Sequence, residues 1–135
     1  LPPVSAGGSS TPTVELSTIQ QLDDDSTELS APYHPPEGYM LFAIMGEPLE
    51  VRVLVPTEFA LPSVQVIGCE SRWNIFAIGK ANELGLLQIH PIHFERMRSL
   101  GLDPLWEPAR LWFAANVLWQ QQDWQPWSCR HVLLR

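Results

Sequence analysis

Apolar and aromatic residues are concentrated in the second half of the chain, and this limits where a folded core can form. All six tryptophans lie between Trp73 and Trp127. Residues 1–38, in contrast, are rich in Pro, Gly, Ser, Thr and Asp and contain no Lys or Arg. Such a segment buries too little apolar surface to offset the entropy lost on ordering. We therefore predict an acidic linker or tail over residues 1–38 and one folded core in the rest of the 135-residue chain.

Charge divides the chain in the same way. Residues 1–58 carry nine acidic side chains and one basic one, whereas residues 59–135 carry six acidic and seven basic side chains. The net charge of -7 therefore comes from the N-terminal part. A nucleic-acid-binding protein needs clustered Lys and Arg to neutralise phosphates, and no such cluster is visible. We expect no nucleic-acid partner.

The sequence contains no candidate membrane span. Its longest uninterrupted apolar run, residues 39–45, is far shorter than the roughly 18 residues that a membrane-spanning helix needs. The first residues, Leu1-Pro2-Pro3, lack the charged start and apolar core of a secretory signal, so such a segment was either removed or never present. We expect a soluble, monomeric chain.

Residues 39–56 have the pattern of a β-hairpin. An apolar run is followed by Gly46-Glu47-Pro48 and then by the alternating residues 49–55, which predicts two strands around a turn. A lone hairpin is only marginally stable in water, so it should pack against the C-terminal part. We treat residues 39–57 as a hairpin extension and residues 58–135 as the helical domain.

Three helices are predicted in the C-terminal part. Ser63 is a candidate N-cap for a helix that ends near residue 71. A second helix is expected to begin at Pro91 and to end at Gly101, and a longer one to begin at Glu107-Pro108. Apolar residues recur in this last helix at three- and four-residue spacing: Leu111, Trp112, Ala115, Leu118 and Trp119. The predicted fold class is mainly α.

Glu70 is the first candidate for acid–base chemistry. It lies near the end of a short and largely apolar helix, where burial disfavours the charged form of a carboxyl group. A raised pKa would make Glu70 a proton donor near neutral pH. The alternative is an ordinary solvated glutamate at a helix end, because perturbed sites are a minority of all carboxylates.

Three sequence blocks resemble one family. Glu70-Ser71, Gly85-Leu86-Leu87-Gln88-Ile89 and the later block over residues 124–129 are similar, in this order, to motifs of the soluble lytic transglycosylases and goose-type lysozymes. That group cleaves bacterial peptidoglycan, and the resemblance covers roughly residues 60 to 130. It implies a small lysozyme-like helical domain that acts on peptidoglycan glycan strands without a cofactor.

The resemblance also implies roles for individual residues. Glu70 would be the general acid that protonates the glycosidic oxygen between N-acetylmuramic acid and N-acetylglucosamine. Ser71 would support the site by a hydrogen bond, although a bond to its own backbone is the alternative. Gln88 would line the groove or bridge its own loop, and Gly85 would let the backbone approach the sugar closely.

A second carboxyl group and two aromatic side chains complete the expected site. Glu83 is the acid nearest in sequence that could face Glu70 and position a water, or else it is a solvated loop residue. We favour a single-acid mechanism, in which the N-acetyl group or the 6-hydroxyl of the substrate takes the second role. Trp73 and Trp127 are the tryptophans most suited to stacking on sugar rings, the others being core residues.

Cys69 and Cys129 gain a meaning from the same resemblance. A disulfide between them would pin the helix of Glu70 to the C-terminal end, and it would fit a secreted protein, cell-wall associated or phage-borne. Two buried free thiols are the alternative. His90 and His93 share one possible helical face, but zinc needs three or four ligands and we expect no metal site.

Two positions depart from the family pattern. Leu111 stands where the family often has an asparagine, which removes a polar support, and Asn116 lies near the place expected for the family's groove tyrosine. These departures keep a second hypothesis open, a peptidoglycan-binding or assembly module without turnover. A third hypothesis is a virion-associated or secretion-linked protein that docks through its acidic tail.

Overall fold

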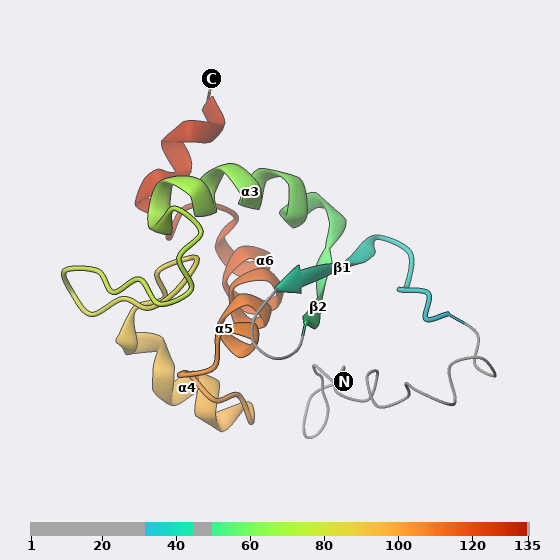
Figure 1. Cartoon of the computed structure of the whole chain (residues 1–135), viewed down its shortest axis with the longest axis horizontal. Coiled ribbons are helices and arrows are strands. Elements are labelled where there is room, and N and C mark those ends of the chain that lie inside the picture. The colour runs from blue at the N-terminus through green and yellow to red at the C-terminus, as the bar shows by residue number, and fades with distance from the viewer. Residues whose placement is uncertain (1–31, 45–49, 135) are drawn as a thin grey trace.

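The computed structural model describes residues 32–44 and 50–134. Residues 1–31 of the tail predicted over residues 1–38, and the predicted turn Gly46-Glu47-Pro48, lie outside the described residues. A two-stranded sheet is followed directly by a long helix, and shorter helical segments make up the rest of the described chain (Figure 1). The mainly α prediction is therefore confirmed. No helix in this part of the chain has both the length and the apolar character to cross a membrane.

The predicted hairpin is present. Strand β1 (Tyr39–Ile44) pairs with β2 (Val51–Pro56) in an antiparallel register that places Phe42 opposite Val53. Val53 and Val55 are fully buried, as expected for alternate residues on one face of a strand. They belong to the same hydrophobic core as the helices, so the hairpin packs as part of the helical domain.

Helix α3 (Thr57–Ser71) follows β2 without a loop. It ends at the predicted residue but begins six residues before Ser63, so the prediction that Ser63 is its N-cap is wrong. Pro56 has the extended backbone of an N-cap residue, and Ser63 is buried inside the helix, where its hydroxyl donates to the carbonyl of Ala60 at 2.5 Å. Ser63 misleadingly suggested a helix start, because a serine hydroxyl can also make its hydrogen bond to the backbone inside a helix.

The second predicted helix has two parts. A 3₁₀ turn, η1 (Pro91–His93), leads into α4 (Phe94–Ser99). Gly101 follows with a φ of +81°, the left-handed conformation expected of the residue that stops a helix.

The third predicted helix begins at Glu107, as expected. It runs through α5 (Glu107–Phe113), a π-helical stretch η2 (Ala114–Leu118) and α6 (Trp119–Gln122). The chain then enters a second 3₁₀ segment, η3 (Ser128–Leu134), which lies beside the C-terminal end of α3 (Figure 1). The fully buried side chains along α5 and η2 include Leu111, Phe113 and Ala115, and both segments pack against β2.

Candidate functional site

Glu70 lies in the last turn of α3, close to the start of η3. The helix ends at Arg72, which adopts a left-handed conformation with a φ of 54°. The Glu70 side chain is half-buried, and its Oε2 atom accepts a hydrogen bond of 3.1 Å from the backbone N–H of Cys129. The carboxyl group is therefore held against the C-terminal segment and does not point freely into bulk solvent.

The surroundings of Glu70 raise its pKa above the ordinary value of a glutamate. Burial is the main cause, because it disfavours the charged form. The N–H of Cys129 and the hydroxyl of Ser128 act in the opposite direction, since both donate to the carboxylate. The negative charge of Glu83 raises the pKa further, and His131 lowers it. The raised pKa was expected from the position of Glu70 at the end of an apolar helix.

The Cys69–Cys129 disulfide is present, as expected. It joins two residues 60 positions apart in the sequence, with their Cα atoms at 5.9 Å. Cys69 precedes Glu70, and the N–H of Cys129 donates to the Glu70 carboxylate. The cross-link therefore holds the donor and the acceptor of this hydrogen bond close together. A cross-link closing a loop of this length stabilises a fold by about 4 kcal/mol on the chain-entropy model.

Glu83 lies on the loop between α3 and η1, and its pKa is lowered. Its Oε1 atom accepts a 2.9 Å hydrogen bond from the N–H of Ala81. Hydrogen bonds from the backbone of Glu83 itself and of Ala81 are the main causes of the lowered pKa, and the charge of His90 adds to them. Glu83 is thus ionised at neutral pH, close enough to Glu70 for its charge to act on that carboxyl group.

Gly79 leaves room for two of the candidate side chains. A methyl group built on Gly79 would collide with the Oε1 atoms of both Glu83 and Gln88. These two oxygens therefore converge beside the α-carbon of Gly79. This contact joins Gly79 to residues four and nine positions away, so it has no local signature in the sequence.

Ser71 and Gln88 make the local hydrogen bonds that were left open as alternatives. The Ser71 hydroxyl donates to the carbonyl of Ile67 at 3.2 Å within α3. The Nε2 atom of Gln88 donates to the carbonyls of Ala77 (3.3 Å) and Gly85 (3.0 Å), which ties the loop together. The amide oxygen of Gln88 remains directed toward Gly79.

Gly85 lies against a buried ion pair. Its φ is +84°, and a methyl group on it would collide with the Glu107 carboxyl group and approach the Arg110 guanidinium. Glu107 and Arg110 are both nearly fully buried, with Oε1 and Nη2 2.7 Å apart. The same Oε1 accepts the N–H of Leu86 at 3.3 Å. Gly85 itself is buried.

The Glu107–Arg110 pair was not recognised in the sequence. Burial raises the pKa of Glu107 to about 7, although Arg110 and the Leu86 N–H oppose the shift. The Glu107-Pro108 dipeptide gave only the start of a helix. The (i, i+3) spacing of the two charges could have suggested an ion pair, but nothing local indicated that it would be buried.

The two tryptophans expected to stack on sugar rings lie in opposite environments. Trp127 is 3% exposed, and its Nε1 donates to the carbonyl of Leu87 at 2.9 Å, so its ring belongs to the core. Trp73 is 47% exposed and stacks on Phe42 of β1 with ring centroids 6.5 Å apart. Its φ of 65° continues the left-handed turn begun at Arg72.

The remaining singled-out residues have structural contacts. His90 accepts the N–H of Ile92 at 2.9 Å through Nδ1 and so caps η1, and the His93 ring lies 5.8 Å from that of Phe113. Asn116 donates from Nδ2 to the carbonyl of Leu54, which ties η2 to β2 at 2.9 Å. Across residues 32–44 and 50–134, no three or more His, Cys, Asp or Glu side chains gather as metal ligands would.

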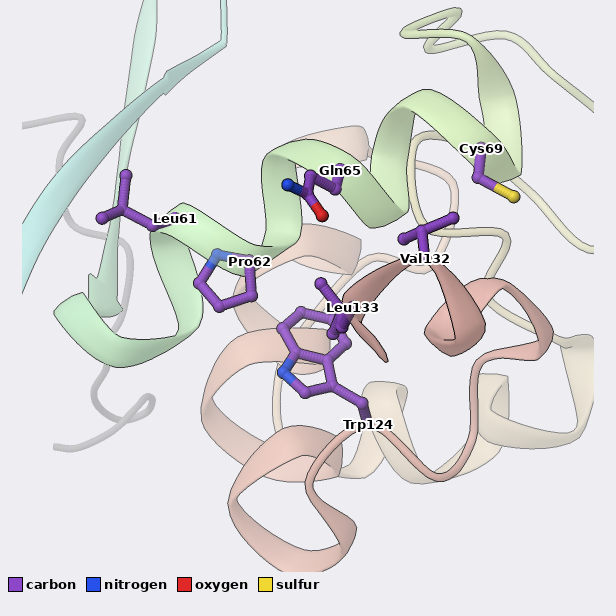
Figure 2. A pocket seen from close by; sticks show the side chains of 7 residues that line it. All are labelled: Leu61, Pro62, Gln65, Cys69, Trp124, Val132 and Leu133. Carbon is purple, nitrogen blue, oxygen red and sulfur yellow. The ribbon is translucent and has the colours of Figure 1, made fainter. Parts of the chain in front are cut away.

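A groove of about 910 Å³ lies next to the disulfide. Figure 2 shows that residues of α3 form one of its sides, whereas Trp124 and residues of η3 form the other. Its lining residues are Leu61, Pro62, Gln65, Cys69, Trp124, Val132 and Leu133. Glu70 is not among them, so the candidate acid and this groove are separate features of the α3–η3 contact.

Comparison of the chain with protein-family models, with curated proteins and with solved structures finds no match to any of them. The function is therefore proposed from the chemistry of Glu70 and its neighbours, together with the three motifs.

Proposed function

We propose that the chain is a peptidoglycan-cleaving glycosidase with a lysozyme-like domain. Its reaction would be cleavage of the β-1,4 bond between N-acetylmuramic acid and N-acetylglucosamine, with Glu70 as the general acid. One observation carries this proposal: Glu70 and Glu83 interact through their charges, and their surroundings shift the two pKa values in opposite directions. Two carboxyl groups whose pKa values are shifted apart are typical of the acid and its ionised partner in glycoside cleavage.

Glu70 suits the acid role because burial keeps a larger share of it protonated near neutral pH. Its Oε2 atom is occupied by the Cys129 N–H, so its Oε1 atom is the one that would carry the proton to the glycosidic oxygen. As the bond to the leaving oxygen breaks, the ring of the N-acetylmuramic acid develops positive charge. The negative charge left on Glu70 and that of Glu83 would both stabilise it.

Two routes complete the reaction. In a hydrolase, Glu83 would take a proton from an attacking water, and its hydrogen bond from Ala81 would hold it ionised for that role. In a transglycosylase, the 6-hydroxyl of the substrate attacks C1 of its own ring, gives its proton to the carboxylate left on Glu70 and forms an anhydro-sugar. The first route requires the Glu83 carboxylate, whereas the second requires only Glu70.

Exposed aromatic rings close to Glu70 in the sequence support a carbohydrate substrate. Trp73 is partly exposed, and Phe76, which the sequence analysis did not single out, is 80% exposed. Such faces allow sugar rings to stack. The disulfide supports a location outside the cytoplasm, where peptidoglycan is found.

Purified protein incubated with bacterial cell walls tests the proposal. Glu70→Gln removes the proton donor with little change in shape, and we expect wall clearing to fall by at least about a hundredfold. Glu95→Gln is the matched control, because Glu95 is an exposed glutamate on α4. Clearing by Glu70→Gln at the rate of the parent would show that Glu70 is not the acid.

Mass spectrometry of the released fragments separates the two routes. Transglycosylation yields muropeptides that are lighter by one water than those from hydrolysis. Hydrated ends, together with loss of activity in Glu83→Gln, would identify a two-carboxylate hydrolase. Anhydro ends with Glu83→Gln still active would identify the single-acid route.

A peptidoglycan-binding module without turnover is the second candidate. One observation that favours it is Leu111, which is fully buried at the position where the family often has an asparagine. Another is Gln88, whose Nε2 atom already donates to carbonyls of its own loop. Retention of purified glycan strands without release of any fragment would support this candidate over the enzyme.

A further inference from the structure

An exposed indole side chain follows the candidate acid in a turn that fixes its position. Trp73 is 47% exposed, although tryptophan side chains are well buried on average. The turn is closed by a 3.0 Å hydrogen bond from the N–H of Asn74 to the carbonyl of Ser71. Within it, Arg72 and Trp73 have φ values of 54° and 65°, a left-handed conformation that costs free energy for residues other than glycine. The chain therefore pays an energetic cost to direct this side chain.

The hairpin covers one face of the Trp73 ring. The rings of Trp73 and Phe42 are stacked, with their centroids 6.5 Å apart and their planes inclined by 18°. Phe42 pairs with the fully buried Val53 across the hairpin and packs against the core, so the supporting ring is itself anchored. At its edge, the Nε1 atom of Trp73 lies 3.8 Å from where a methyl group on Gly68 would be. With one face covered in this way, the exposed surface of Trp73 is mainly that of its outer face.

We propose that Phe42 is a positioning residue for substrate binding, because it holds the Trp73 indole so that the outer face of this ring binds a sugar ring of the glycan strand. The inference deepens the proposed function and rests on it, since the ligand is the strand that Glu70 would cleave. Both the indole face and the C–H face of a sugar ring are flat and apolar, which allows them to stack. An indole that is already held from behind loses little conformational entropy when the sugar binds.

The hairpin thereby gains a part in substrate binding. It precedes residues 60 to 130, which the resemblance to the peptidoglycan-cleaving family covers, so the stack of Phe42 on Trp73 joins a segment outside the resemblance to one inside it. The alternative is that Trp73 only shields Phe42 from water. In that case both rings would contribute to the stability of the fold and neither would affect sugar binding.

The direct test is a titration of the full chain with a β-1,4-linked tetramer of N-acetylglucosamine, followed by the indole N–H signals in ¹⁵N NMR spectra. A Glu70→Gln background prevents cleavage during the titration, and the signal that disappears in Trp73→Leu is that of Trp73. We expect the Trp73 signal to shift on binding and Trp73→Leu to weaken binding about tenfold. An unshifted Trp73 signal, or a folded Trp73→Leu variant that binds as tightly as the parent, would overturn the proposal.

The role of Phe42 is tested in the same titration. Phe42→Leu keeps an apolar residue in the strand but removes the stacked ring, so we expect the Trp73 signal of the free protein to move and binding to weaken roughly two- to tenfold. Phe42→Tyr keeps the ring and should restore both parent values. Tyr39→Leu is the matched control, because it removes an aromatic ring from the opposite face of β1. Parent-like binding by folded Phe42→Leu, or equal weakening by Tyr39→Leu, would contradict the positioning role.

Kinetics on soluble glycan strands, measured with Glu70 intact, separate this inference from the proposed function. We expect Trp73→Leu and Phe42→Leu to raise KM by the factors seen in binding and to leave kcat nearly unchanged, because neither side chain transfers a proton. A fall in kcat with an unchanged KM would contradict the assignment. If the parent cleaves no glycan strand, the proposed function is wrong, whereas the NMR titration still decides whether Trp73 binds a sugar.

Discussion

Removing the Cys69–Cys129 disulfide should lower the free energy of unfolding by about 4 kcal/mol. The cross-link spans 60 positions of the sequence, and closing a loop of that length removes about 14 cal/mol/K of entropy from the denatured chain. A domain of this size is typically stable by about 5–15 kcal/mol, so the loss is a large share of the total. The Cys69→Ala/Cys129→Ala double variant tests this value because it leaves no free thiol.

Urea denaturation followed by tryptophan fluorescence gives the difference in unfolding free energy. Three of the reporting rings, Trp119, Trp124 and Trp127, lie in one aromatic cluster of the core. The oxidised parent, the parent after reduction and the double variant should be compared. We expect the reduced parent and the double variant to unfold at similar, much lower urea concentrations. A difference below about 1 kcal/mol between them and the oxidised parent would refute the loop-entropy reasoning.

Two further predictions concern the contacts beneath the loop that carries Gln88. Gly85→Ala should destabilise the fold by several kcal/mol more than Gly101→Ala, as measured by thermal unfolding, because both glycines have a positive φ but only Gly85 lies against the Glu107–Arg110 pair. Equal losses would show that backbone strain alone explains Gly85. Burial raises the pKa of Glu107 to about 7 from an ordinary value of 4.5, so its stabilising contribution is fully present below about pH 4.5 and is lost as the pH rises through 7. The free energies of unfolding measured by urea denaturation at pH 5 and pH 8 should differ by up to about 3 kcal/mol because of Glu107, and Glu107→Gln should remove that difference.

Local patterns predicted most of the secondary structure. Alternation of apolar residues located β2, and the Glu107-Pro108 dipeptide located the start of α5. Ser63 misled because one hydroxyl can accept a backbone N–H as an N-cap or donate to a carbonyl inside a helix, and here it donates to the carbonyl three residues earlier. Which of the two forms depends on where the helix begins, and here α3 begins at Thr57, directly after the last strand residue Pro56.

The candidate site was predictable in part. Glu70 could be chosen from its place in an apolar helix, and the raised direction of its pKa followed from the same reasoning. The burial of Trp127 and the packing of Gly85 against Glu107 could not be foreseen, because a tryptophan in a loop and a turn glycine carry no sign of what lies opposite.

The sequence by itself determined the uneven distribution of charge and of tryptophans, the hairpin, and the helix starts at Pro91 and Glu107, since these depend on neighbours within a few residues. Only the tertiary structure decided what surrounds Glu70. Its hydrogen bond to Cys129 spans 59 positions and the bond of Trp127 to Leu87 spans 40. Such contacts form when packing brings distant segments together, and the burial that shifts a pKa exists only once they have met.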